Sequence, residues 1–108
     1  MRVLLDECVP RPLRREFPSH EVRTIRELGW AGKKNGELLR LMAADGFQVL
    51  LTVDRSLRHQ QNLMAAGVAV IIMVAASNRL DDLYPVVPSV ESALATIQPG
   101  EALEVRAP

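Results

Sequence analysis

The stretch that decides the fold is Val68–Val74, which reads VAVIIMV. It is a nearly continuous run of apolar, mostly β-branched residues that follows Gly67. Runs without alternating polar residues are typical of strands that are buried on both faces of a parallel sheet. Because parallel strands need a long, usually helical crossover between them, this segment predicts an α/β fold.

Shorter apolar segments alternate with helical patterns on either side of this strand. Further strands are expected at Val3–Leu5, His20–Ile25, Phe47–Val53 and Ala102–Arg106. Helices are expected near 10–17, over Glu37–Asp45, around Arg58–Ala66 and through 80–97. The alternation predicts a three-layer α/β/α sandwich with a central, mainly parallel sheet of four or five strands. Residues 1–108 are expected to form a single domain.

Composition excludes several classes of protein. With 48% hydrophobic and 24% charged residues, the chain has enough apolar surface for a core, so intrinsic disorder is not expected. The longest uncharged apolar run, Ala65–Ala76, is too short to span a membrane, and the first residues lack a signal-peptide pattern. The single cysteine, Cys8, excludes an internal disulfide framework and favours a reducing cytoplasm as the location.

The formal net charge is zero, but the charges are unevenly distributed. Residues 1–62 carry a net charge of +3 and residues 63–108 a net charge of −3. Eleven of the 13 basic residues are arginine, whose planar guanidinium group matches the geometry of phosphate. The first part of the chain could therefore bind an anionic partner, although ordinary solvated helix surfaces would give the same charge pattern.

Three acidic residues from distant parts of the chain are expected at one edge of the sheet. Asp6 follows the first strand, Asp54 follows the third, and Glu37 begins the helix that returns after the second strand. In parallel α/β sheets, ligands bind outside the carboxyl ends of the strands, where these three residues should meet. Each acid also has a local explanation, as a helix cap, a first-turn residue or a turn residue.

Their joint placement favours a metal site. Carboxylates that lie close together repel one another unless a cation binds or a proton is retained. Oxygen ligands suit hard divalent cations, so the expected cofactor is Mg²⁺ or Mn²⁺. A cation held in this way points to phosphodiester chemistry.

The same residues carry a resemblance to a known family. The segments LLDECVPRPLRREFP (4–18) and LLTVDRSL (50–57), followed by QQN (60–62), resemble short bacterial PIN-like domains related to VapC-type toxin nucleases. This resemblance implies a PIN-type sandwich and a metal-dependent ribonuclease in which Asp6, Glu37 and Asp54 are the catalytic, metal-binding acids. It also implies RNA as substrate and a possible antitoxin protein as partner. Asn78 occupies the region where full PIN nucleases carry a fourth acid.

Other residues are candidates for contact with RNA or with a second protein. Arg11 and Arg14 flank the end of the first strand, and Arg55 and Arg58 flank the end of the third. They could hold phosphates, with help from the amides of Gln61 and Asn62, or they could be ordinary surface residues. The apolar segment 84–87 makes a homodimer conceivable.

Two other functions remain open at this point. Asp6, Asp54 and Ser77 follow the first, third and fourth expected strands and resemble the layout of receiver-type phosphoacceptor domains, but the lysine expected after the fifth strand is missing. The missing fourth acid also fits a catalytically weak domain that binds another protein.

Overall fold

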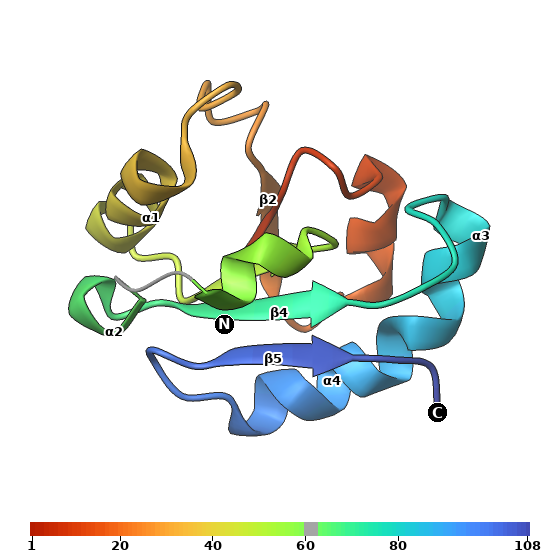
Figure 1. The fold of residues 1–108 in the computed structure, drawn as a ribbon. Coiled ribbons are helices and arrows are strands. Elements are labelled where there is room, and N and C mark those ends of the chain that lie inside the picture. Colours follow the sequence, from red (N-terminus) through yellow and green to blue (C-terminus); the bar gives the residue numbers. More distant parts are fainter. Residues whose placement is uncertain (60–62) are drawn as a thin grey trace.

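The computed structural model describes residues 1–59 and 63–108, and its centre is a five-stranded parallel sheet (Figure 1). The strands lie in the order β2-β1-β3-β4-β5, and every neighbouring pair is parallel. Their bounds are β1 Arg2–Leu5, β2 Glu21–Thr24, β3 Val49–Thr52, β4 Ala69–Met73 and β5 Ala102–Val105. The predicted α/β fold is confirmed, with five strands.

Burial follows from the position of each strand in the sheet. Every residue of β3 and β4 is buried, because these strands have neighbours on both sides and helices on both faces. The continuous apolar run that predicted a parallel sheet is therefore β4 itself. The edge strand β2 alternates exposed and half-buried residues, which is the pattern of a strand with one covered face.

One face of the sheet is covered by η1 (Arg11–Glu16), α3 (Leu80–Leu83), η3 (Tyr84–Val86) and α4 (Val87–Thr96). Alternate strand residues point to this side, since successive side chains of a strand face opposite ways. Leu5, Leu51 and Ile71 pack there against Phe17 and Val90. This cluster is the larger of the two halves of the core.

The opposite face is covered by α1 (Asn35–Ala44), η2 (Arg55–His59) and α2 (Leu63–Ala66). Leu4, Leu50 and Ile72 point to this side and pack against Leu39 and Leu57. The two hydrophobic clusters lie on opposite sides of the sheet, so the chain forms a three-layer α/β/α sandwich, as predicted.

Three helices have a proline in their first turn. Pro12 lies in the first turn of η1, and Pro85 and Pro88 lie in the first turns of η3 and α4. A first-turn proline costs no hydrogen bond, because its missing N–H has no partner within the helix. The region 80–96 therefore runs as a chain of short helices without an intervening loop.

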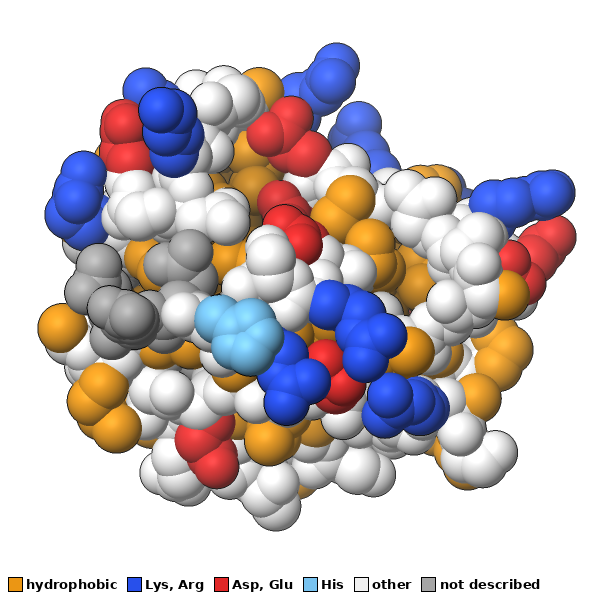
Figure 2. All heavy atoms as spheres, in the orientation of Figure 1, with side chains coloured by type: hydrophobic (Ala, Val, Ile, Leu, Met, Phe, Trp, Pro, Cys, Tyr) orange, Lys and Arg blue, Asp and Glu red, His pale blue; other side chains and the backbone are white. Residues whose placement is uncertain are grey.

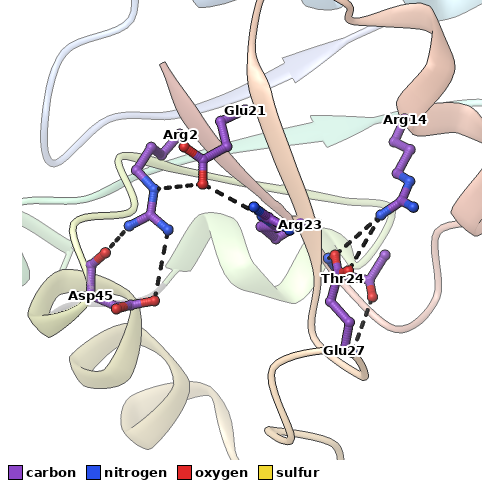
Figure 3. A network of polar contacts seen from close by, with 7 residues as sticks. All are labelled: Arg2, Arg14, Glu21, Arg23, Thr24, Glu27 and Asp45. Carbon is purple, nitrogen blue, oxygen red and sulfur yellow. Dashed lines mark hydrogen bonds and ion pairs between the residues drawn. The ribbon is translucent and has the colours of Figure 1, made fainter.

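Arg2 links β1 to β2 and to the end of α1 at the amino end of the sheet (Figure 3). Its Nε donates to Glu21 on β2 at 3.2 Å, and its guanidinium group also contacts Asp45 at the end of α1. The same group lies 4.2 Å above the ring of Phe47, a cation–π contact.

No helix within the described part of the chain is long and apolar enough to cross a membrane.

The strand order singles out one position at the opposite, carboxyl end of the sheet. The chain moves from β1 to β2 on one side and then crosses to β3 on the other side of β1. Connections therefore leave in opposite directions at the β1–β3 pair, which is the topological switch point where open α/β sheets bind ligands. Asp6 follows β1 and Asp54 follows β3, so both acids flank this point.

Leu50 is completely buried on the α1 side of the sheet and provides a test of this packing. We expect Leu50→Ala to lower the free energy of unfolding by about 2–5 kcal/mol, since it removes apolar contacts and leaves a cavity. Urea unfolding followed by circular dichroism measures the change. Met64→Ala is the control, because the side chain of Met64 is 71% exposed and its loss should change stability by less than about 0.5 kcal/mol. Equal stability of the two variants would contradict the described core.

Candidate functional site

A buried hydroxyl group joins the two acids at the switch point. Among the described residues, Thr52 is the only polar residue in the buried class. Its Oγ1 donates a hydrogen bond to Oδ2 of Asp6 at 2.7 Å and accepts one from the backbone N–H of Asp54 at 3.0 Å. The end of β3 therefore positions the Asp6 carboxylate and the start of the Asp54 loop together.

Asp6 is held from several sides. Its backbone N–H donates to the carbonyl of Leu51 at 3.0 Å, which extends the β1–β3 pairing by one residue. Its Oδ1 accepts from the backbone N–H of Glu7 at 2.9 Å, and the thiol of Cys8 lies 3.7 Å from Oδ2. Asp6 is half-buried, so this carboxylate is fixed by the fold and still reaches the surface.

Asp54 caps the short helix η2. Its Oδ1 accepts from the backbone N–H of Ser56 at 3.0 Å and from the Ser56 hydroxyl at 2.7 Å. The local explanation of Asp54 as a cap is therefore correct for one of its two oxygens. Within residues 1–59 and 63–108, Oδ2 of Asp54 receives no hydrogen bond, and the residue is exposed. We call Asp6 and Asp54 the acid pair, and Thr52 the bridge between them.

Glu37 begins α1, at the same end of the sheet, but its contact is local. Its carboxylate forms an ion pair with Lys33 at 3.2 Å and is 46% exposed. In the described part of the chain, no three or more His, Cys, Asp or Glu side chains are grouped so that they could hold a metal ion. The structure therefore links Asp6 with Asp54 and leaves Glu37 outside the group, and the three-acid metal site stays a prediction.

Asn78 lies beside the loop that follows β1. Its Nδ2 donates to the backbone carbonyl of Cys8 at 2.9 Å, two residues after Asp6. The residue that the resemblance places at the position of a fourth acid is thus bonded to the loop of the acid pair, and its amide nitrogen stabilises that loop. Glu7 points elsewhere, since its Oε1 accepts from the backbone N–H of Gly32 at 3.0 Å.

A cleft of about 350 Å³ opens beside Asp6, between the carboxyl ends of β1 and β2. Its apolar lining comes from Leu5, Val9, Pro10 and Ile25, and its polar lining from Asp6, Glu7, Arg11, Thr24, Arg26 and Glu27. Arg11, a predicted RNA contact, therefore lies at a cavity next to the acid pair.

The other predicted RNA contacts have different surroundings. Arg14 forms an ion pair with Glu27 at 3.2 Å, which ties η1 to the loop after β2 (Figure 3). Arg55 and Arg58 both contact Glu104 on β5. Gln61 and Asn62 lie outside the described residues.

Sequence analysis missed Thr52, Glu104 and Arg106 as parts of this edge. Thr52 had a signal, because it is a hydroxyl residue at the end of an otherwise apolar strand. Glu104 gave no signal by spacing, since it contacts Arg55 and Arg58, which are almost fifty positions away, and Arg106 joins this edge through its ion pair with Glu104. Only the β4–β5 pairing brings them to η2.

The acid pair suits a divalent cation by the chemistry of its donors. Mg²⁺ in proteins is commonly held by one or two carboxylates, with water and substrate phosphate oxygens completing its shell. Asp6 and Asp54 supply two carboxylates at an exposed edge, and each ionised carboxylate offers about four lone-pair positions. The hydrogen bonds described above leave positions open on both residues.

Comparison of the chain with protein-family models, with curated proteins and with solved structures finds no match.

Thr52→Val tests the bridge. Valine has the shape of threonine without its hydroxyl, so the Asp6 carboxylate and the Asp54 N–H lose a shared buried partner. We expect a loss of about 1–3 kcal/mol in the free energy of unfolding, measured by urea denaturation. Thr52→Ser keeps both hydrogen bonds and should be more stable than Thr52→Val. A valine variant as stable as the native protein would show that the hydroxyl does not hold this edge together.

Glu27 provides a test by pH. A hydrogen bond from the backbone N–H of Thr24 and the nearby Arg14 lower the pKa of Glu27 below its ordinary value of 4.5. A lowered folded-state pKa stabilises the protein above the unfolded pKa, and this contribution is lost as the pH falls through the folded pKa.

We therefore expect the native protein to exceed Glu27→Gln in unfolding free energy at pH 7, and the difference to shrink between about pH 5 and pH 3. Urea unfolding at several pH values measures it. Glu16→Gln is the control, since Glu16 is exposed and makes no side-chain hydrogen bond or ion pair within the described residues. A difference for Glu27→Gln that does not change with pH would contradict the described contacts.

Proposed function

We propose that this chain is a divalent-cation-dependent ribonuclease that hydrolyses RNA phosphodiester bonds at the carboxyl edge of its sheet. The observation that carries the proposal is the Thr52 hydroxyl, which joins the carboxylate of Asp6 to the backbone of Asp54 at the switch point. Because the Thr52 hydroxyl has hydrogen-bond partners, its burial costs little free energy of folding. In this proposal, it orients oxygen ligands for a cation.

Each residue of the site has a role in this proposal. Asp6 and Asp54 would hold Mg²⁺ or Mn²⁺, and Glu37 would contribute through water from the start of α1. A bound divalent cation activates water for attack and stabilises negative charge on the phosphate. Thr52 keeps the Asp6 carboxylate in one orientation, and Ser56 leaves Oδ2 of Asp54 directed away from its capping interaction. The resemblance to PIN-like domains supports the same assignment.

The proposal also includes an anionic substrate, protein partners and a location in the cell. An excess of arginine in residues 1–62 suits an anionic substrate. From the resemblance, we further propose that the protein is a toxin with an antitoxin protein as its partner. The single cysteine favours a cytoplasmic location, and the apolar segment 84–87 favours a homodimer.

Cleavage of RNA by the purified protein tests the proposal. We expect cleavage of a labelled single-stranded RNA in Mn²⁺, its loss in EDTA, and a fall in rate on the order of 100-fold or more in Asp6→Asn and in Asp54→Asn. These substitutions keep the side-chain shape and remove the charge. Glu16→Gln, which removes an acid outside this edge, should cleave as fast as the native protein.

Two results would contradict the ribonuclease. Equal cleavage by the native protein and both asparagine variants would show that any activity comes from elsewhere. The absence of heat on titration with millimolar Mg²⁺ or Mn²⁺ would favour the alternative of a catalytically weak protein-binding module.

The strand order favours a second candidate, a receiver-type phosphoacceptor. The order 2-1-3-4-5 is shared by flavodoxin-like folds, which include receiver domains. Asp54 would be the phosphorylated residue, because it follows β3 and is exposed. Against this candidate, Arg106 rather than a lysine follows β5, and the Ser77 hydroxyl donates to Asp82 at 2.5 Å. Labelling of Asp54 by acetyl phosphate would favour this function over the ribonuclease.

A further inference from the structure

A cluster of three arginines surrounds Glu104 on β5. Arg55 contacts both carboxylate oxygens through Nε and Nη2, each at 3.3 Å. Arg58 donates from Nη1 at 3.0 Å, and Nη2 of Arg106 lies 3.6 Å from Oε1. We call Arg55, Arg58, Arg106 and Glu104 the arginine cluster. It joins η2 to the last strand, so it is built by the fold and not by a local run of charge.

The cluster carries an excess of positive charge on the surface. Three guanidinium groups share one carboxylate, so its net charge is +2. The side chains of Arg55, Arg58 and Arg106 are 58%, 50% and 59% exposed, whereas that of Glu104 is only 15% exposed. Figure 2 shows basic side chains gathered around an acidic one on this face of the molecule. One carboxylate cannot satisfy the five N–H groups of each arginine, so donors remain directed to solvent.

Glu104 orders these donors. The hydrogen bond from Arg55 lowers the pKa of Glu104, with further lowering by the charges of Arg58 and Arg106, so the carboxylate remains ionised at neutral pH. Long arginine side chains on a surface otherwise sample many rotamers, and ordering them costs binding free energy. A shared carboxylate reduces this cost for an anion that binds the cluster.

The cluster lies on the same edge of the sheet as the acid pair. Arg55 directly follows Asp54, and Arg106 directly follows the end of β5. Since β5 is two strands from β3 and three from β1, the strand spacing places its end about 10–14 Å along the edge from the acid pair. A chain of phosphates that reaches the acid pair would therefore pass within reach of the cluster.

We propose that the arginine cluster binds backbone phosphates of a single-stranded nucleic acid, on the β5 side of the acid pair. This inference rests on the proposed ribonuclease function and adds the side on which the substrate strand extends. Arginine contacts phosphate oxygens through paired N–H groups, which these side chains retain. A nucleic acid is favoured over an acidic protein because the cluster continues the edge at which phosphodiester chemistry is proposed.

Equilibrium binding in EDTA tests the cluster without cleavage. The probe is a fluorescein-labelled oligouridine of about 12 nucleotides, a length within the range covered by small single-strand-binding domains. We expect Arg106→Ala to weaken binding about fivefold and to lower the slope of log K against log salt by about 0.7. Thermal unfolding of each variant shows that it is folded.

Arg40→Ala is the matched control. Arg40 is exposed on α1, outside the arginine cluster, and its side chain has no hydrogen bond or ion pair within the described residues. The two alanine variants change the net charge equally, so only a local contact separates them.

Equal effects of Arg106→Ala and Arg40→Ala would overturn the proposal. Binding of polyglutamate but not of oligouridine would also overturn it, in favour of an acidic protein as partner. Since no cleavage is measured, a ribonuclease that fails the activity test can still show this binding, and an active ribonuclease can still lack it.

Discussion

The hydrogen bonds of the Thr52 hydroxyl are the constraint on which the rest of the carboxyl edge depends. A polar group in the core needs partners, because an unsatisfied buried hydroxyl costs free energy. Here both partners belong to the loops that carry the acids, namely the Asp6 side chain and the Asp54 backbone. The hydrogen bonds of one buried hydroxyl thus hold two acidic residues that follow strands far apart in the sequence.

Three different groups of side chains lie along the carboxyl edge of the sheet. The cleft with Arg11 lies at β1 and β2, the acid pair lies at β1 and β3, and the arginine cluster lies at β5. Since all five strands are parallel, every connection after a strand begins at this edge, which concentrates polar side chains there. The amino end of the sheet is closed instead by Arg2 and its partners (Figure 3).

The sequence predicts the fold better than it predicts the site. The buried run at β4 and the alternation of strands with helices depend on local patterns, and both predictions are confirmed. The position of Asp6 and Asp54 follows from topology, because Asp6 directly follows β1 and Asp54 lies two residues after the end of β3. Glu37 shows the limit of that reasoning, since a helix start can lie at the right edge while its carboxylate pairs with Lys33. The contacts of Glu104 depend on strand pairing and could not be derived from spacing.

The central claim is that Asp6 and Asp54, joined through Thr52, form a site for a divalent cation. A crystal grown or soaked in Mn²⁺ tests it most directly, by anomalous diffraction at the manganese edge. The account predicts an anomalous peak bound by carboxylate oxygens of both residues, and the loss of that peak in a double asparagine variant. A map without a peak at this edge, or with manganese bound only elsewhere on the protein, would contradict the account.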